Sequence, residues 1–226
     1  MKLKALKSAF PITLPVFTGY LFLGIGYGIL MNKSGLSLPL TIVMSTLVFT
    51  GAMQFAAIPL FLSSFNPISV FILSMMVNLR HLFYGISLLP KYKNLGIKKY
   101  FMIFSLSDET FSINVASTIK EDINPGWFYF FVSLLDYLYW AIASVIGFLL
   151  ASKIPNNIKG IDFVLTALFY VLFLNQWDVK HNRVYLLLGL FCTTLALVLV
   201  GKTQFLLVAM ILLFGCIMID YQRRKI

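Results

Sequence analysis

The sequence predicts an all-α polytopic membrane protein, a helical bundle with about six full spans and two broken or re-entrant helices. Of its 226 residues, 60% are apolar and 12% are charged, whereas a soluble domain has about 25% charged residues. The mean hydropathy is +0.90. These values exclude a soluble enzyme, a disordered tail and a disulfide scaffold. We therefore treat residues 1–226 as a single transmembrane domain.

Eight apolar segments support this fold, and Pro, Gly, Asn or Lys residues delimit each of them. They lie at about residues 10–31, 36–63, 67–90, 100–119, 127–152, 161–175, 184–200 and 203–221. The first segment follows three lysines, as the apolar run of a signal peptide does. Its run is longer than that of a signal peptide and lacks a small-residue cleavage site, so we expect an uncleaved first span.

Two of these segments are expected to be interrupted. The second contains the pair Gly51-Ala52 and then Pro59, and the fourth contains Asp108 and Glu109 near its middle. Non-helical backbone at membrane depth is tolerated only where protein buries it or where it lines a cavity. We therefore expect each of the two to form a broken or re-entrant helix, while the other six cross the membrane.

The basic residues at the segment ends predict the orientation, because cytoplasmic loops carry an excess of Lys and Arg. If all eight segments cross, the loops on the two sides of the membrane carry nearly equal numbers of Lys and Arg residues. If the second and fourth segments return to the side they enter from, about 13 basic residues fall on one side and about 4 on the other. This arrangement places both termini and the loop 91–99 in the cytoplasm. The net charge of +10 is then a topology signal and not a nucleic-acid patch.

Two apolar stretches resemble each other. Residues 20–29 and 137–146 match at four positions, which begin with Tyr20 and Tyr137 and end with Ile29 and Ile146. Duplication of a transporter half would produce such a match. Chance agreement between two apolar sequences would produce it as well, and the sequence leaves both explanations open.

The third segment carries the polar residues Asn78, Arg80 and His81 near its centre. An ionisable side chain in the membrane core is energetically costly, which makes each such residue a functional candidate. At helical spacing Asn78 and His81 lie on one face, whereas Arg80 and Tyr84 point elsewhere. The helix must therefore meet polar surroundings on two sides, or be unwound here.

Asp108 and Glu109 lie at a similar depth in the fourth segment. A single arginine, Arg80, facing two carboxylates leaves a surplus negative charge, which a proton on one acid removes most simply in a low dielectric. That is the chemistry of proton coupling. Two alternatives remain open: a structural bridge between Arg80 and a carboxylate, and a pair of carboxylates solvated in a cavity.

Four further residues are candidates. Gly24 and Gly26 belong to a glycine-rich run in which four-residue spacing, as between Gly24 and Gly28, permits close helix packing. The run also permits a broken helix whose backbone N–H groups bind a substrate carboxylate. Gln54 follows the Gly51 break, and its amide either binds a ligand or bridges two helices. Asp136, in the fifth segment, is a third acid for proton coupling, and a helix-bridging role is equally open.

Several chemistries lack their signatures in this sequence. It contains no HExxH, GxSxG or P-loop motif, which argues against a metalloprotease, a serine hydrolase and an ATP-driven pump. Cys192 and Cys216 lie in apolar runs without metal-type spacing, and we expect them to be small buried hydrophobes. We expect no cofactor and no metal ion.

Six stretches carry a family resemblance: TLPVFTGYLFLGIGYGIL (13–30), FTGAMQF (49–55), VNLRHLFYGISL (77–88), SDETF (107–111), residues 140–147 and GIDFVLTALF (160–169). In these stretches the chain resembles the AzlC family, the large subunit of two-component branched-chain amino acid exporters. The NLRH-x-x-Y and DE-T-F motifs are the specific part. Asp136 is not matched to a family motif.

The resemblance implies a permease of a prokaryotic cytoplasmic membrane that exports valine, leucine, isoleucine and sometimes methionine, driven by an ion gradient. It also implies a small hydrophobic AzlD-type partner. We expect Arg80 or a broken-helix N-terminus to hold the substrate carboxylate, with Asn78, Gln54, Gly24 and Gly26 as further binding candidates. One of the three acids would hold the ammonium or carry the proton. The rival interpretations are an intramembrane aspartate-dependent enzyme and a structural or assembly subunit.

Overall fold

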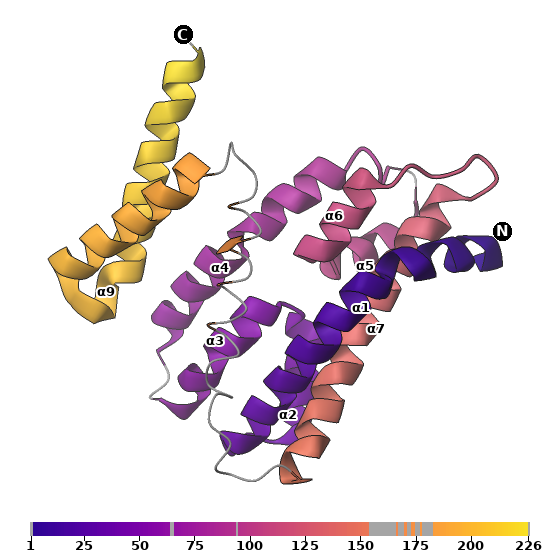
Figure 1. Cartoon of the computed structure of the whole chain (residues 1–226), viewed down its shortest axis with the longest axis horizontal. Helices are drawn as coiled ribbons and strands as arrows, with labels where there is room; N and C mark the ends of the chain where they lie inside the picture. The colour runs from indigo at the N-terminus through magenta and orange to yellow at the C-terminus, as the bar shows by residue number, and fades with distance from the viewer. Residues whose placement is uncertain are drawn as a thin grey trace. The chain divides into compact units, whose positions relative to one another are not determined.

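The computed structural model of the chain describes residues 2–63, 66–93, 95–153 and 183–225, together with residues 166, 170, 173, 174 and 177. Every regular element in these ranges is a helix, which confirms the predicted all-α class (Figure 1). The chain forms two compact units, Met1–Leu165 and Thr166–Ile226, each described by itself. That the whole chain is one permease domain stays a prediction.

Two long helices, α1 (Lys2–Lys33) and α7 (Pro125–Leu150), form the centre of the first unit. They run in the same direction (Figure 1). Gly24 and Gly28 let them touch, because a Cβ at Gly28 would collide with the backbone of Ser144 and Phe148. Small residues allow this close approach of two helix backbones. Helix α1 is continuous, so the packing role of its glycines is confirmed and the broken-helix alternative for this segment is wrong.

The second apolar segment is interrupted, as predicted. It consists of α2 (Leu38–Val43), the π-helical turn η1 (Met44–Val48) and α3 (Gly51–Leu62). The interruption lies at Phe49 and Thr50, directly before the glycine that suggested it. Phe49 has a φ of 42° in the left-handed region, where a side chain is unfavourable, and Thr50 is extended. A turn of this kind ends one helix and redirects the chain into the next.

The fourth segment is interrupted as well. It consists of α5 (Lys98–Phe104) and α6 (Asp108–Ala116), separated by Ser105–Ser107. Lys91, which precedes α5, donates hydrogen bonds of 2.8 Å to the carbonyl oxygens of Asn114 and Val115 at the end of α6. The end of α6 therefore lies on the side from which α5 begins. This confirms that the segment is broken and forms a hairpin, and its re-entry into the membrane stays a prediction.

Helix α4 (Pro67–Leu88) indicates where the second segment begins and ends, and this is consistent with re-entry from the opposite end. Its last residue, Leu88, packs with Ala5 and Ala9 near the start of α1. Its 22 residues span about 33 Å, so its first residue lies near the end of α1. Segment two therefore begins and finishes on that side, and α5 with α6 enter from the other side (Figure 1).

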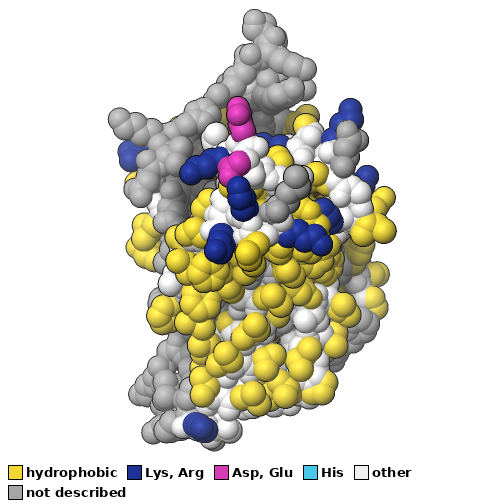
Figure 2. All heavy atoms as spheres, turned by 90° about the vertical axis from the view of Figure 1, so that its right-hand side faces the viewer, with side chains coloured by type: hydrophobic (Ala, Val, Ile, Leu, Met, Phe, Trp, Pro, Cys, Tyr) yellow, Lys and Arg dark blue, Asp and Glu magenta, His cyan; other side chains and the backbone are white. Residues whose placement is uncertain are grey.

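Charged side chains gather at the end of the unit where α1 begins. Lys2 and Lys98 lie over the ring of Trp127, and Lys4 pairs with Asp122 at 3.3 Å. On the face that Figure 2 shows, Lys, Arg and acidic side chains cluster at one end of a hydrophobic band. The N-terminus and the loop 91–99 thus share one side, as predicted. That this side is the cytoplasm stays a prediction.

The second unit contains α9 (Arg183–Lys225), which Gly201, with a φ of 71°, divides into two arms. Tyr185 donates a hydrogen bond of 2.8 Å to Asp220, so the arms fold back on each other and match the predicted seventh and eighth segments. Four stretches among the described residues are long and apolar enough to span a membrane: Lys2–Lys33, Val70–Leu88, Pro125–Lys153 and Arg183–Gly201. The predicted segment 161–175 lies largely outside the described residues, so the count of six stays a prediction.

Candidate functional site

The candidate site is built around the start of α6, half-way along the first unit. Ser107 caps this helix, because its hydroxyl oxygen accepts the backbone N–H of Thr110 at 3.2 Å. Asp108 and Glu109 occupy the first helical turn. The partial positive charge at a helix N-terminus favours carboxylates in this position. The break in segment four therefore places two acids at the tip of the hairpin.

Arg80 of α4 and Asp108 form an ion pair. The distance from Arg80 Nη1 to Asp108 Oδ2 is 2.7 Å, and the two side chains are 34% and 27% exposed. Among the described residues, Arg80 Nε and Asp108 Oδ1 have no hydrogen-bond partner. The sequence predicted that Arg80 faces both acids. The structure pairs Arg80 with Asp108, and the Nε of Arg80 and the Oδ1 of Asp108 remain available as one donor and one acceptor within this pair.

Glu109 turns toward a different helix. The hydroxyl of Tyr20, on α1, lies 2.7 Å from Glu109 Oε2 and 2.7 Å from the Oγ of Ser107. Tyr20 itself is buried, whereas Glu109 is partly exposed. The first turn of α6 is therefore tied to the middle of α1 through polar contacts.

Asp136 lies on α7 and is fully buried. Its Oδ2 accepts a hydrogen bond of 2.7 Å from Thr110 Oγ1, and Ser107 Oγ lies 3.1 Å from the same Thr110 oxygen. Within the part of the chain that the structure describes, neither Asp136 nor Glu109 has an ion-pair partner. The structure thus brings all three predicted acids to the start of α6, but only Asp108 has a cation beside it.

Helix α4 stays helical through its polar centre, so the unwound alternative is wrong. The amide nitrogen of Asn78 lies 3.3 Å from Ser74 Oγ, one turn earlier on the same face. Tyr84 stacks on Phe111 of α6 with ring centroids 4.4 Å apart. Arg80 and Tyr84 therefore share the face of α4 that meets α6, where the sequence predicted only that they point away from the face of Asn78. No described contact places Asn78 at the ion pair, and its binding role stays a prediction.

Gln54 bridges helices. Its Oε1 accepts a hydrogen bond of 2.8 Å from Trp140 Nε1 on α7, and its Nε2 lies 3.2 Å from Ser45 Oγ in η1. Of the two roles that the sequence left open, the structure shows the bridge. Gly24 and Gly26 lie buried inside continuous α1, so neither presents the start of a helix to a ligand.

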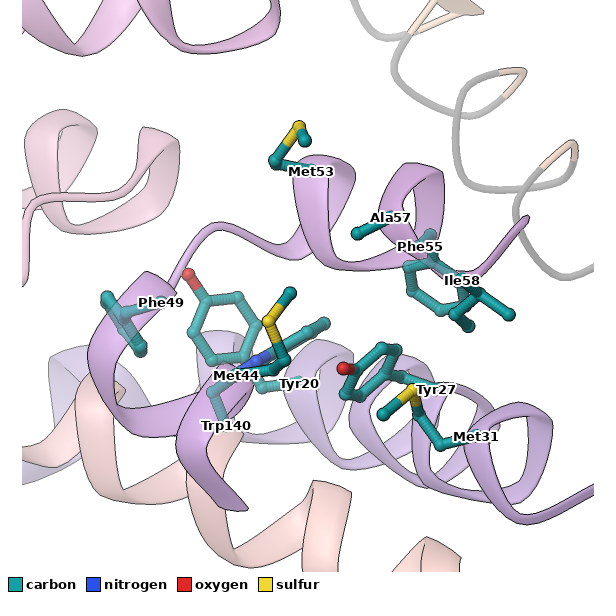
Figure 3. Packing of buried hydrophobic residues seen from close by; sticks show 10 residues of the cluster. All are labelled: Tyr20, Tyr27, Met31, Met44, Phe49, Met53, Phe55, Ala57, Ile58 and Trp140. Atoms are coloured by element: carbon teal, nitrogen blue, oxygen red, sulfur yellow. The ribbon is translucent and has the colours of Figure 1, made fainter. Parts of the chain in front are cut away.

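An apolar cluster adjoins these polar contacts through Tyr20 and Trp140, whose ring centroids are 5.4 Å apart. Figure 3 shows the cluster between α3 and the two long helices, and the rings of Tyr27 and Phe55 are in edge-to-face contact with centroids 5.4 Å apart. Its buried members are Tyr20, Tyr27, Met31, Met44, Phe49, Met53, Phe55, Ala57, Ile58 and Trp140. Phe and Met side chains of this kind suit an aliphatic group.

The sequence analysis missed Tyr20, Ser107 and Thr110. A local signal existed for one of them, since a serine before Asp-Glu-Thr is a typical helix cap. No local signal existed for the others. Tyr20 and Glu109 are 89 positions apart, and Thr110 and Asp136 are 26 positions apart, so only the folded arrangement joins them.

Comparisons with known proteins identify a family and relatives described as membrane or transport proteins. The model of a protein family described as "AzlC protein" matches residues 15–154, which include every residue of the candidate site. The chain is 46% identical over 211 residues to the "Branched-chain amino acid transport protein AzlC" of Bacillus subtilis, covering 93% of this chain and 83% of the relative. An "Uncharacterized membrane protein" of Haemophilus influenzae is 38% identical, with 92% and 86% covered. No solved structure matches the chain.

Proposed function

The chain belongs to the AzlC family, and from this premise we propose that it is the permease subunit of a secondary transporter that exports branched-chain amino acids. The proposed substrates are valine, leucine and isoleucine, with methionine as a fourth. The name of the Bacillus subtilis relative supports the substrate class. We further propose that the protein lies in the cytoplasmic membrane of a prokaryote and works with a small hydrophobic AzlD-type subunit.

The ion pair between Arg80 and Asp108 carries this proposal. A free amino acid has one carboxylate and one ammonium group on neighbouring carbons. Its carboxylate would pair with the planar fork of Arg80, which suits two-point binding, and its ammonium would pair with Asp108. The substrate would then replace one ion pair by two. No buried charge is left without a partner in either state, which keeps the cost of opening the pair low.

Partial exposure of this ion pair supports access by a substrate. The two side chains are 34% and 27% exposed, whereas Asp136 is fully buried. The atoms Arg80 Nε and Asp108 Oδ1 are buried and lack partners within the described residues, so they would offer one donor and one acceptor once the ion pair opens. A zwitterion needs both.

The apolar cluster would receive the substrate side chain. It approaches the polar contacts at Tyr20 and contains Phe49, Met53 and Phe55 along the broken segment. A branched aliphatic side chain gains from burial roughly in proportion to its apolar area, about 25 cal/mol per Å². Aromatic and methionine walls also adapt to valine, leucine and isoleucine alike. This supports a substrate class defined by apolar volume.

Proton coupling would use the acids that have no cation beside them. Glu109 and Asp136 lack an ion-pair partner in the described chain, and burial of two uncompensated carboxylates is unfavourable. In this scheme Asp108 binds the ammonium group of the substrate and does not carry the coupling proton. The enzyme alternative would need two carboxyl groups acting on one substrate atom. The contacts of Asp108 with Arg80 and of Asp136 with Thr110 support transport instead.

Efflux of radiolabelled amino acids from preloaded cells tests the proposal. Cells that express the chain with the small subunit should lose labelled leucine and valine faster than cells that express the Arg80→Ala variant. A proton ionophore should abolish this difference. Labelled lysine, which carries an extra positive charge, serves as the control substrate and should leave at the same rate in both strains. Equal leucine efflux from both strains would contradict the proposal.

A further inference from the structure

Five side chains form a continuous row of hydrogen-bond contacts between two acids. From one end to the other they are Glu109, Tyr20, Ser107, Thr110 and Asp136, and the four distances between their oxygens are 2.7, 2.7, 3.1 and 2.7 Å. We call the three residues in the middle the hydroxyl chain. They come from α1, from the cap of α6 and from its first turn. The acids at the ends come from α6 and α7.

We propose that the hydroxyl chain is a proton wire, and that Glu109 and Asp136 share a single proton through it. This inference rests on the proposed function for its biological role, because it names the device that would couple amino acid export to protons. The wire itself is a property of the five side chains.

Counting hydrogens supports one shared proton. The three hydroxyl groups provide three hydrogens, but the row has four contacts between oxygens. With both acids ionised, one contact would join two oxygens without a hydrogen. One added proton supplies the fourth hydrogen, and every contact is then a hydrogen bond. The same proton removes one of two negative charges that have no cation beside them.

The chain can point in either direction. When Glu109 holds the proton, it donates to Tyr20, which donates to Ser107, then to Thr110 and finally to ionised Asp136. Transfer breaks four O–H bonds and forms four, because each of the four hydrogens moves along its hydrogen bond to the next oxygen toward Asp136. The proton then rests on Asp136, Glu109 is ionised, and every hydroxyl has reversed its direction. No other reactant is needed.

The capping contact of Ser107 is compatible with both directions. Its oxygen always accepts the backbone N–H of Thr110, and it can accept one further hydrogen and donate one. In one state it accepts from Tyr20 and donates to Thr110, and in the other it does the reverse. The start of α6 therefore does not have to move for the proton to move.

The two ends of the wire differ in access. Glu109 is partly exposed, and Asp136 is fully buried. Protons would therefore enter at Glu109 and be stored at Asp136. The groups nearest the Glu109 end are Tyr84 on α4 and Asp108 on α6. Arg80 and His81 on α4 act on Asp108. A substrate that separates Arg80 from Asp108 would change the charge next to Glu109, and that links export to proton movement.

Infrared spectroscopy of purified protein tests the wire without any transport. At neutral pH the wild type should show the carbonyl band of one protonated carboxyl group from this pair. Both Glu109→Gln and Asp136→Asn should remove that band, because an amide at either end supplies the fourth hydrogen and leaves the remaining acid ionised. Loss of the band in only one variant, or in neither, would overturn the shared proton.

Transport measurements test whether the wire conducts. Tyr20→Phe and Thr110→Val each remove one hydroxyl and keep nearly the same shape. In liposomes with the small subunit, both variants should lose leucine-driven proton movement by about tenfold or more, and Thr110→Val, which lies outside the apolar cluster, should keep leucine exchange. Tyr129→Phe is the matched control, since Tyr129 is a buried tyrosine of α7 outside both the row and the apolar cluster, and it should behave as the wild type.

The outcomes separate the wire from the proposed function. Wild-type proton movement in both Tyr20→Phe and Thr110→Val would overturn the wire. Should Tyr20→Phe not fold, the result for Thr110→Val alone tests the wire. If the wild type moves leucine without protons, the proposed coupling fails. The infrared result would still show whether Glu109 and Asp136 share a proton.

Discussion

The indole of Trp140 holds the start of α3 through Gln54: its Nε1 donates a hydrogen bond of 2.8 Å to Gln54 Oε1. The same ring lies against Gly51, where a Cβ would be 3.0 Å from it. A side chain of continuous α7 is thus in contact with the first turn after the break in segment two. The position of that break depends on a neighbouring helix as well as on its own sequence.

Replacement of Trp140 by phenylalanine should destabilise the protein. The variant leaves the buried Oε1 of Gln54 without its donor, which costs about 1 to 3 kcal/mol. We expect a lower melting temperature in detergent, measured by light scattering. The double variant Trp140→Phe, Gln54→Leu should recover part of this loss, because both polar partners are then absent. An unchanged melting temperature for Trp140→Phe would show that the bridge contributes nothing.

Replacement of Arg80 should separate charge from geometry. Arg80→Ala should abolish transport and reduce folded yield, since Asp108 loses its cation. The pair is about one-third exposed, so the stability loss should be about 1 to 2 kcal/mol and smaller than for a fully buried pair. Arg80→Lys keeps the charge but loses the planar fork, and it should restore folding better than activity. Wild-type flux in liposomes containing purified Arg80→Ala would remove Arg80 from the site.

Glu109 and Asp108, adjacent in sequence, should respond differently to neutralisation. Glu109→Gln mimics a protonated acid, so exchange of substrate across the membrane should continue while pH-driven uphill transport stops. Asp108→Asn leaves Arg80 without its partner, and both activities should fall together with folded yield. Counterflow exchange and pH-driven uptake in the same preparations distinguish the two cases. Identical behaviour of both variants would mean that the acids do not have separate roles.

The close contact of α1 and α7 predicts a contrast between two glycines of the same helix. Gly28→Ala should strongly reduce folded yield, because the new Cβ meets backbone atoms of Ser144 and Phe148 that cannot move aside. Gly19→Ala is the control. Nothing lies within 4 Å of a Cβ at Gly19, and alanine favours a helix by about 1 kcal/mol over glycine. Equal yields of the two variants, measured by fluorescence-detected gel filtration, would contradict this packing.

The sequence was sufficient to predict both interruptions. Gly51 and Pro59 mark the second segment, and Asp108 with Glu109 marks the fourth, because these residue types are unfavourable within a lipid-facing helix. The observed break at Phe49 precedes the predicted one slightly. A left-handed phenylalanine has no sequence signature, and it depends on packing by neighbours such as Tyr137, whose ring centroid is 4.9 Å away.

The candidate site could be predicted only in part. Charged residues inside apolar segments are rare, and Arg80, Asp108, Glu109 and Asp136 were therefore visible in the sequence. The sequence did not show which acid pairs with Arg80, because Asp108 and Glu109 are adjacent and point in different directions from one helical turn. A hydroxyl side chain costs little free energy in a membrane helix, and such residues occur throughout the chain. Their role therefore depends on which helices meet.

The breaks in the second and fourth segments have a consequence for movement. α3 and α6 both begin directly after a break, so each of the two segments has a non-helical turn between its two helical parts. A hairpin tip can tilt by changing a few backbone torsions near Phe49 or Ser105, whereas displacing α1 from α7 would separate a packed glycine interface. Helices α1 and α7 would then stay in place while the hairpins move. Opening toward either side would be a small local rotation, with a low barrier and no exchange of partners between full spans.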